Sequence, residues 1–302
     1  MRPVMLAVVL LAASFTPAAA AGSVRVAFAG SMGVVMDRFI GPEFAKANDA
    51  TYQGIGQGAY ALARLIAGRK LQADVFVSVT PGPVKLLEKA GLAAKAEPVA
   101  STAMVIAYGP KSRFAPALAA SERGGAAPWW QVLEKPGLRF GRTDPATDPQ
   151  GRNIVFTMLL AERYYHQPDL AKQILGPYEN PAQIFTEPSL LSRLEAGQID
   201  ASSGYESAVI SDHLPFVPLP DEINLSNPAM EPSWYSKVHF SIRGPGGKQV
   251  LLSTEPLVFY AAVLENAANP GLARKFVEFL QSPAAQKAFA EKGYGRPMGG
   301  PI

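Results

Sequence analysis

The chain has 302 residues, no cysteine, a formal net charge of +3 and an apolar content of 48%. The lack of cysteine excludes disulfide bonds and thiolate metal sites, so the core alone must hold the fold together. Basic and acidic residues are interspersed without a run of lysine or arginine. This pattern argues against nucleic acid or an anionic membrane as the partner.

The N-terminal residues follow the pattern of a secretory signal peptide. Arg2 precedes an apolar run over residues 4–15, and small residues follow as far as Ala20 and Ala21. The apolar run is shorter than the ~20 residues that a membrane-spanning helix needs. We therefore expect residues 1–21 to be a leader that is cleaved near Ala20 or Ala21. The remaining chain of roughly 280 residues is long enough for one large or two medium domains.

The first predicted strand, Val24–Ala29, ends in a glycine turn that opens a helix. The turn is Gly30-Ser31-Met32-Gly33, and the helix has one apolar face made of Met32, Val35, Met36, Phe39 and Ile40. A strand that ends in this way presents free backbone N–H groups and the positive end of a helix dipole, which together suit an anion. The alternative is that Gly30 and Ser31 form only a turn and a helix N-cap.

A second unit repeats this pattern. Residues 50–53 predict a short strand, residues 54–59 a glycine-rich turn, and Leu62, Leu65 and Ile66 a helix. The turn lacks the lysine of a Walker A loop and the further glycine of a dinucleotide-binding turn. It therefore indicates a place where a ligand can approach backbone N–H groups closely.

A third strand is predicted over residues 73–79 and a helix over residues 84–90, followed by one long apolar strand over residues 99–108. Strands that alternate with helices predict an α/β protein with a parallel sheet. Between residues 111 and 137 the composition shifts to alanine, glycine and proline. We expect the chain to pass into a second lobe there.

Two aspartates, Asp144 and Asp148, each precede a proline in the loop before a helix that carries Ile154 and Val155. This arrangement places carboxylates at the corners of a rigid turn. Capping of the helix explains one aspartate fully, but two carboxylates in one turn are harder to explain by capping alone.

Helices and strands can be predicted in the same way for the rest of the chain. A helix over residues 188–196 stops at Gly197, and a strand from Ile199 leads into Gly204-Tyr205-Glu206 and another helix. The remaining predictions are an edge strand over residues 216–220, a return to the first lobe over 233–243, a segment that is apolar on two faces over 257–264, and amphipathic helices over 272–280 and 283–290.

Four places share one arrangement, in which a strand end delivers backbone N–H groups or a small polar side chain to a helix start. They are Gly30-Ser31, Gly56–Ala59, Asp148–Gly151 and Gly204–Glu206. Together with the leader and with the segments 73–78, 219–225 and 273–283, this order resembles the periplasmic molybdate/tungstate-binding proteins of ABC importers. The resemblance covers nearly the whole mature chain and rests on order and spacing rather than on a single motif.

The resemblance implies an α/β protein with the two-lobed type II periplasmic binding protein fold. Each lobe would be a mixed, mainly parallel sheet flanked by helices, with the ligand in the cleft between the lobes. We expect the first lobe over residues 22–107 and again over 237–302, and the second lobe over 108–236. The resemblance also implies a periplasmic monomer that is not an enzyme, needs no cofactor and hands its oxyanion to an ABC permease.

The family pattern implies a site with residues from both lobes. The ligand-binding residues would be Gly30, Ser31, Gln57, Gly58 and Ala59 in the first lobe and Asp148, Gln150, Tyr205 and Glu206 in the second. The serine that the family has in the second segment is missing, and Gln57 or Ala59 stands in its place. Members with the Asp-Pro turn use an aspartate and a glutamate that complete a six-coordinate metal centre.

The two family carboxylates match this chain unequally. The aspartate matches Asp148 best, with Asp144 as the alternative, but the glutamate falls where this chain has Gly204, so Glu206 is its nearest carboxylate. A dianion beside Asp148 is repelled unless that carboxylate bonds the metal centre, is protonated or is screened by a cation such as Arg152.

Another ligand in the same cleft is an open alternative. Sulfate or a similar anion fits if no carboxylate touches the ligand. A small organic or cationic solute fits if the carboxylates contact it together with aromatic rings, for which the candidates are Trp129, Trp130 and Trp234.

A secreted serine hydrolase is a more distant alternative. Residues 29–33 approach the nucleophile elbow, but Ala29 replaces its first glycine. A catalytic triad also needs a histidine, and the positions of His166, His213 and His239 suit structural or exposed residues better.

Overall fold

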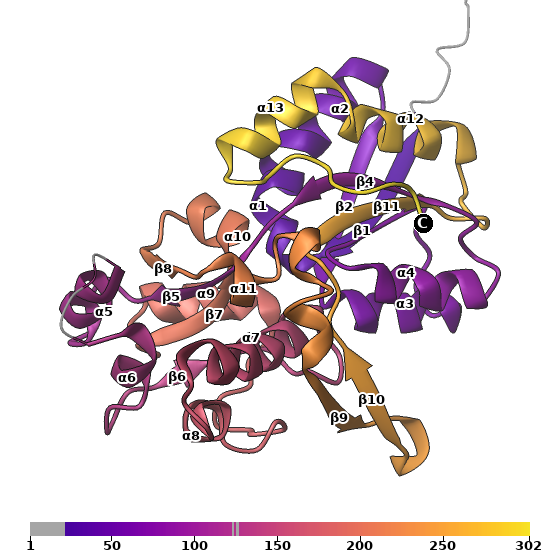
Figure 1. Cartoon of the computed structure of the whole chain (residues 1–302). Coiled ribbons are helices and arrows are strands. Elements are labelled where there is room, and N and C mark those ends of the chain that lie inside the picture. Colours follow the sequence, from indigo (N-terminus) through magenta and orange to yellow (C-terminus); the bar gives the residue numbers. More distant parts are fainter. Residues whose placement is uncertain (1–21, 123, 125–126) are drawn as a thin grey trace, which may run out of the picture.

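The computed structural model of the chain describes residues 22–122, 124 and 127–302. The predicted leader, residues 1–21, and its cleavage position lie outside the described residues. The rest of the chain forms two lobes that lie side by side (Figure 1). Within the described part, no helix combines the length and the apolar character needed to span a membrane.

The strands and helices alternate along much of the chain. The strands are β1 Ser23–Ala29, β2 Thr51–Gln57, β3 Val75–Ser78, β4 Ala96–Ser101, β5 Met104–Tyr108, β6 Phe140–Gly141, β7 Ala201–Tyr205, β8 Phe216–Pro218, β9 His239–Arg243, β10 Gln249–Ser253 and β11 Val258–Val263. The α-helices are α1 Gly33–Val35, α2 Gly41–Asn48, α3 Ala59–Ala67, α4 Pro81–Lys89, α5 Ala115–Glu122, α6 Trp129–Leu133, α7 Pro149–Tyr165, α8 Leu170–Leu175, α9 Glu187–Glu195, α10 Glu206–Ser211, α11 Asp221–Asn224, α12 Pro270–Leu280 and α13 Pro283–Glu291. Shorter helical turns are η1 Gly30–Met32, η2 Met36–Ile40, η3 Pro228–Met230, η4 Tyr235–Lys237 and η5 Pro245–Gly247.

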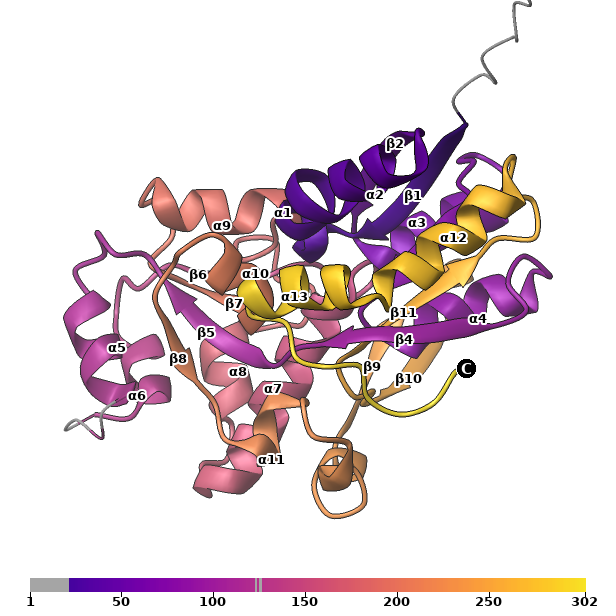
Figure 2. The same ribbon diagram turned by 90° about the horizontal axis from the view of Figure 1, so that it is seen from above.

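The first lobe is built on a five-stranded sheet in the order β2-β1-β3-β11-β4. β1 pairs in parallel with β2 and β3, whereas β11 runs antiparallel to β3 and β4. Residues 258–262 of β11 are all buried, as expected for a central strand that is apolar on both faces. Helices α3 and α4 cover one face of this sheet, and α2 and α12 cover the other (Figures 1 and 2).

The second lobe holds a four-stranded sheet in the order β6-β7-β5-β8. β6 and β7 are parallel, but β5 is antiparallel to both β7 and β8. The predicted α/β architecture with mixed sheets is confirmed, while the expectation of mainly parallel pairing is wrong, since among the described residues two of the four strand pairs in the first sheet and two of the three in the second are antiparallel. β8 lies at the edge, where Pro218 can be accommodated although it has no N–H to donate.

The chain crosses from the first sheet to the second earlier than expected. The predicted single strand over residues 99–108 is two strands, β4 and β5, which belong to different sheets. The break lies at Thr102, whose hydroxyl accepts hydrogen bonds from the backbone N–H of Ser207 at 3.2 Å and from its hydroxyl at 3.0 Å. Because β4 and β5 are both almost wholly buried, the apolar run continues across the break and does not reveal it.

The chain also returns to the first sheet later than expected. Residues 233–243 do not join that sheet, because β9 pairs with β10 in a hairpin that projects from the body (Figure 1). The ring of Phe240 in β9 packs against Phe156 and Tyr178 of the second lobe. The return is made by β11, and α12 and α13 follow close to the predicted positions.

The helix after β1 contains a π turn, η2, between α1 and α2. Pro42 follows this turn and has no N–H for an intrahelical hydrogen bond, so a wider turn before it relieves the mismatch. The wider turn also changes the phase of the helix. As a result Phe39, which was predicted on the buried face, is 38% exposed.

The glycine-rich turn after the second strand is shorter than predicted. β2 continues to Gln57 and pairs with β1 along its whole length, so residues 54–57 are strand and the turn is confined to Gly58. A Cβ on Gly56 would lie 2.8 Å from the ring of Phe28. The glycine within the strand therefore makes room for this core side chain.

Candidate functional site

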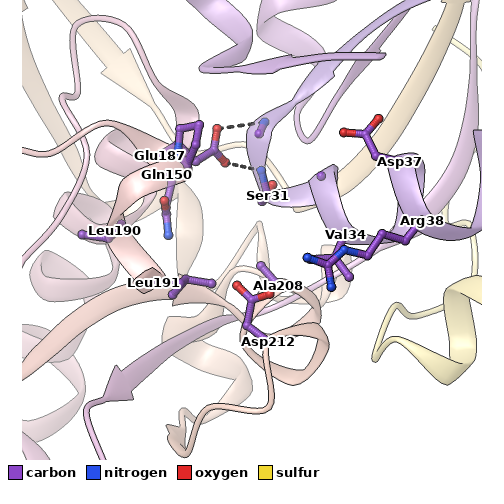
Figure 3. Close-up of a pocket in the computed structure, with 14 residues that line it drawn as sticks. Ser31, Val34, Asp37, Arg38, Gln150, Glu187, Leu190, Leu191, Ala208 and Asp212 are labelled. Atoms are coloured by element: carbon purple, nitrogen blue, oxygen red, sulfur yellow. Dashed lines mark hydrogen bonds between the residues drawn. The ribbon is translucent and has the colours of Figure 1, made fainter. Parts of the chain in front are cut away.

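The ends of β1 and β2 in the first lobe face the starts of α7 and α9 in the second lobe. Two adjoining cavities of about 340 Å³ and about 630 Å³ lie at this boundary. Glu187 and Pro188, at the start of α9, contribute to the walls of both cavities. Figure 3 shows the smaller cavity, with Ser31 and Gln150 in its wall.

Glu187 reaches across this boundary. Its carboxylate accepts hydrogen bonds from the backbone N–H of Gly30 at 3.0 Å and from that of Ser31 at 2.9 Å (Figure 3). These N–H groups belong to the glycine turn after β1, which we predicted to suit an anion. In this structure the turn binds a carboxylate of the same chain.

Asp148 uses its two carboxylate oxygens differently. It is the N-cap of α7, and Oδ1 accepts a hydrogen bond from the N–H of Gln150 at 2.8 Å. Oδ2 lies against the first lobe, where a Cβ on Gly58 would be only 3.1 Å from it. Helix capping therefore explains one oxygen and leaves the other at the boundary between the lobes.

Asp148 and Glu187 form a carboxyl pair, since their side chains lie within hydrogen-bonding reach of each other. Burial raises the pKa of Asp148 to about 6, although the hydrogen bond from Gln150 acts in the opposite direction. Burial and then the charge of Asp148 raise the pKa of Glu187 well above its usual range. Because two carboxylates this close resist joint ionisation, the pair keeps a proton at pH values where isolated carboxyl groups are charged.

The predicted residues of the second strand and turn lie beside this pair. Gln57 and Gly58 line the larger cavity together with Asp148, whereas Ala59 is buried and lines neither cavity. The N–H of Ala61, in the first turn of α3, donates a hydrogen bond of 3.2 Å to the carbonyl of Thr147 in the second lobe. The start of α3 is therefore joined directly to the loop that carries Asp148.

Gln150 and Tyr205 lie on the second-lobe side. Gln150 lines the smaller cavity and donates from Nε2 to a backbone carbonyl of β7 at 3.2 Å. Tyr205 is fully buried at the end of β7, and its hydroxyl accepts a hydrogen bond of 3.0 Å from Asn153. Burial raises the pKa of Tyr205, and the charges of Asp148 and Glu187 add to this effect, so the hydroxyl stays protonated near the pair.

Glu206 is not brought to the carboxyl pair. It begins α10 and lines neither cavity, and burial alone raises its pKa, without a contribution from Asp148 or Glu187. The second carboxylate at the boundary is Glu187, which the sequence analysis did not identify. The sequence around Glu187 shows only that Glu187 and Pro188 begin a helix. A glutamate at that position is common because its charge stabilises the helix dipole, so it does not by itself indicate a binding site.

Asp144 and Arg152 have local partners. Asp144 lines the larger cavity, but its Oδ1 accepts from the N–H of Ala146 within the same turn at 2.8 Å. The guanidinium of Arg152 lies 3.6 Å from the centre of the Tyr60 ring, and its Nε donates to the carbonyl of Pro145 at 2.8 Å. Arg152 thus links the lobes by stacking on Tyr60.

The histidines that a hydrolase would need and the tryptophans that an organic cation would need line neither cavity; they are His166, His213, His239, Trp129, Trp130 and Trp234. The rings of Trp129 and Trp130 pack against Tyr165, and that of Trp234 packs against Tyr164. These tryptophans therefore serve packing. No cluster of three or more histidine, aspartate or glutamate side chains suited to a metal ion occurs in the part of the chain that the structure describes.

Several known proteins are similar in sequence to this chain. A solute-binding protein of Staphylothermus marinus is 28% identical over 219 residues, which cover 64% of this chain and 61% of that protein. The molybdate/tungstate-binding protein WtpA of Thermococcus kodakarensis is 29% identical over 211 residues, which cover 64% of this chain and 57% of that protein. The chain thus spans about three-fifths of the length of these relatives.

Solved structures share the fold at lower sequence identity. The periplasmic molybdate-binding protein of Azotobacter vinelandii has a TM-score of 0.61 and 15% identity, and the match covers 91% of this chain and 100% of that one. This likeness supports the two-lobed α/β fold. The family model of the bacterial extracellular solute-binding proteins matches residues 24–295. Since that match runs from β1 past α13 and includes both the glycine turn and the carboxyl pair, the chain belongs to this family of extracellular solute-binding proteins.

Proposed function

We propose that this protein captures a tetrahedral oxyanion, molybdate or tungstate, between its two lobes and delivers it to an ABC permease. The observation that carries the proposal is the turn after β1, where the N–H groups of Gly30 and Ser31 hold a carboxylate. A carboxylate and an oxyanion both present negatively charged oxygens, so the same donors recognise both. The molybdate/tungstate-binding relative supports this choice of ligand.

The proposed site draws on both lobes. The oxyanion oxygens are held by the N–H groups of the two glycine turns and by the Ser31 hydroxyl. Asp148 and Glu187 face the same space from the second lobe, and Glu187 takes the role that was expected of Glu206. The proposed ligand-binding residues are Gly30, Ser31, Gln57, Gly58, Asp148, Gln150, Glu187 and Tyr205, together with Ala59, which would contribute only its backbone N–H at the first residue of α3.

The carboxyl pair makes the proposed site selective. A dianion next to this pair is repelled by the charge that Asp148 carries above its pKa of about 6. The repulsion is relieved when a carboxylate oxygen bonds the metal centre of the oxyanion. Molybdenum and tungsten allow this because they can expand their coordination shells, whereas the sulfur of sulfate cannot. We infer that the pair selects against sulfate.

Hinge closure of the two lobes completes the proposed mechanism. The chain crosses between the sheets at residues 102–103, and it returns to the first sheet after residue 253. These short crossings are the proposed hinges. We further propose that the mature protein is a periplasmic monomer, exported by the predicted leader, with no nucleic-acid partner and no cofactor.

The test is calorimetry on mature protein that has been freed of bound anion, with molybdate, tungstate and sulfate at equal ionic strength. We expect tight binding of molybdate and tungstate and no heat from sulfate. Equal binding of sulfate would show that the carboxyl pair does not touch the ligand. No binding of any of the three would contradict the proposal and direct the search to other anions and then to organic cations.

A further inference from the structure

The lobes are joined at the proposed site by a carboxylate of the chain itself. Each oxygen of the Glu187 carboxylate accepts one N–H, Oε2 from Gly30 and Oε1 from Ser31. A Cβ on Gly30 would lie 2.9 Å from Oε2, so a glycine at this position permits the close approach. The contact therefore uses the same feature, a bare backbone turn, that would let an oxyanion approach.

The segment that presents Glu187 is fixed to the second lobe. The N–H of Arg142 donates to the carbonyl of Gln183 at 2.8 Å, and the N–H of Phe185 donates to the carbonyl of Arg142 at 2.9 Å. The fully buried Arg142 side chain adds a hydrogen bond of 3.1 Å from Nε to the Gln183 side chain. Glu187 therefore extends from a well-anchored segment, and its contact with the first lobe couples the positions of the two lobes.

Glu187 also divides the space between the lobes. The smaller cavity lies on one side of the Glu187–Pro188 segment and the larger cavity on the other, and both cavities share these two residues. Withdrawal of the Glu187 carboxylate from the first lobe would connect the cavities. The resulting space has the turn after β1 on one wall and Asp148 on another.

We propose that Glu187 is an internal ligand: without an oxyanion its carboxylate occupies the Gly30 and Ser31 N–H groups and joins the lobes, and an incoming oxyanion takes over these two donors. Each backbone N–H has a single hydrogen and directs it well toward one acceptor only, so the two anions compete. The identity of the incoming anion rests on the proposed function, but the contact of Glu187 with the first lobe does not.

The exchange has a consequence for selectivity. A tethered carboxylate acts at a high effective concentration, so a free carboxylate of similar chemistry gains little by replacing it. An anion that makes additional bonds, for example to Asp148 through a metal centre, can replace it. Glu187 therefore excludes small carboxylic acids from a turn that would otherwise accept them.

Hydrogen exchange at the amides of Gly30 and Ser31 tests the proposal in protein freed of bound anion. Glu187→Ala removes the acceptor, and Glu187→Asp keeps a carboxyl group at the start of α9 but, being one methylene shorter, withdraws it from the first lobe. We expect both variants to exchange these two amides roughly ten- to a hundredfold faster than the wild type, because each amide loses its buried hydrogen-bond acceptor. Small-angle X-ray scattering should show a larger radius of gyration for both variants.

The matched control is Glu195→Gln, which removes a carboxylate from the exposed last residue of the same helix. It should leave exchange at Gly30 and Ser31 unchanged. The amides of β3 show whether the core of a variant is intact. If they exchange faster in Glu187→Ala than in the wild type, the core has been disturbed, and Glu187→Asp is compared with the wild type instead. Equal exchange at Gly30 and Ser31 in the wild type and in whichever variant retains its core would overturn the proposal.

Added tungstate separates the two proposals. It should restore slow exchange of Gly30 and Ser31 in Glu187→Ala, since the oxyanion then supplies the missing acceptor. If tungstate and molybdate bind to no variant, the proposed function fails, while fast exchange in the variants would still support Glu187 as the internal acceptor. If tungstate binds without slowing the exchange of these amides, the idea that the oxyanion takes over the same donors is wrong.

Discussion

At the scale of single residues, Asp148 combines a structural task with a chemical one. Oδ1 caps α7 through the N–H of Gln150, while Oδ2 lies at the boundary with Gly58 and near Glu187. Replacement by alanine would remove the cap and the charge together. Asparagine separates the two tasks, because it caps helices as well as aspartate does but carries no charge.

We expect Asp148→Asn to weaken molybdate binding about tenfold or more, since a neutral amide is a much poorer ligand for a metal centre than a carboxylate. The melting temperature should change little at neutral pH or rise. Calorimetry and thermal unfolding measure the two effects, with Asp144→Asn as the control in the same turn. Tighter molybdate binding by Asp148→Asn would show that the carboxylate only repels the anion.

Ser31→Ala should weaken oxyanion binding by roughly five- to tenfold, because it deletes one hydroxyl donor and leaves the backbone N–H in place. Titration calorimetry with molybdate measures the change. The exposed Ser236, which lies outside both cavities, provides a serine-to-alanine control. Unchanged affinity in Ser31→Ala would remove this hydroxyl from the proposed site.

At the scale of elements, features that lie within one continuous stretch of the chain could be predicted from the sequence, whereas contacts between stretches far apart in the chain could not. The turn at Gly30 could be predicted because strand, glycines and helix follow one another directly in the chain. Glu187 lies 157 residues from Gly30, and nothing in the pattern around it indicates a partner at that distance. The crossing at Thr102 was hidden for a different reason, since buried strands on both sides of it give one continuous apolar run.

The close approach of α3 to the Asp148 loop gives a prediction for Gly58. A Cβ here would lie 3.1 Å from Asp148 Oδ2 and 3.2 Å from the carbonyl of Thr147. Gly58→Ala should therefore hold the lobes apart and weaken molybdate binding several-fold, while the protein stays folded. Calorimetry and small-angle scattering would measure these effects.

Gly271 provides the matched control for this substitution. It lies in the first turn of α12, and a Cβ there would meet only Asn269, at 3.7 Å. Gly271→Ala should leave affinity unchanged and, if anything, raise the melting temperature through its better helix propensity. Equal affinity in Gly58→Ala and the wild type would show that the Gly58 contact does not matter for closure.

At the scale of the whole molecule, the alternation of strands and helices predicted an α/β protein, and the composition shift over residues 111–137 together with the family resemblance predicted two lobes. Which segments belong to which lobe was harder to predict from the sequence, because it depends on pairing between strands that lie far apart in the chain. The hairpin of β9 and β10 was expected to return to the first lobe, yet its Phe240 packs on the second lobe. Its alternation of buried and exposed residues indicates a strand but does not indicate which lobe it covers.

The carboxyl pair should make the stability of the whole molecule depend on pH. Burial raises the pKa of Asp148 from 3.8 to about 6, so the folded protein binds this proton more tightly than the unfolded chain does. The resulting stabilisation is fully present below pH ~4 and is lost as the pH rises through about 6.

Thermal unfolding of the anion-free wild type and of Asp148→Asn at pH 5 and pH 7 measures this contribution. We expect the wild type to lose a few degrees more than Asp148→Asn between the two pH values. Glu187 titrates together with Asp148, so the comparison measures the pair, while the more distant titrating groups affect both proteins alike and cancel. Parallel changes in the two melting temperatures would mean that the pair of Asp148 and Glu187 does not take up a proton on folding.

The position of β11 determines the order in which the lobes can be completed. Residues 258–263 lie between β3 and β4 in the first sheet, whereas the strands of the second sheet all lie between residues 104 and 218. During synthesis, β11 is therefore made about 160 residues after β4 and about 180 residues after β3, the two strands that it joins. The lobe that is started first is finished last, and the nascent chain stays incompletely folded until almost its whole length has been made, which is the condition in which an exported chain can be threaded through a membrane.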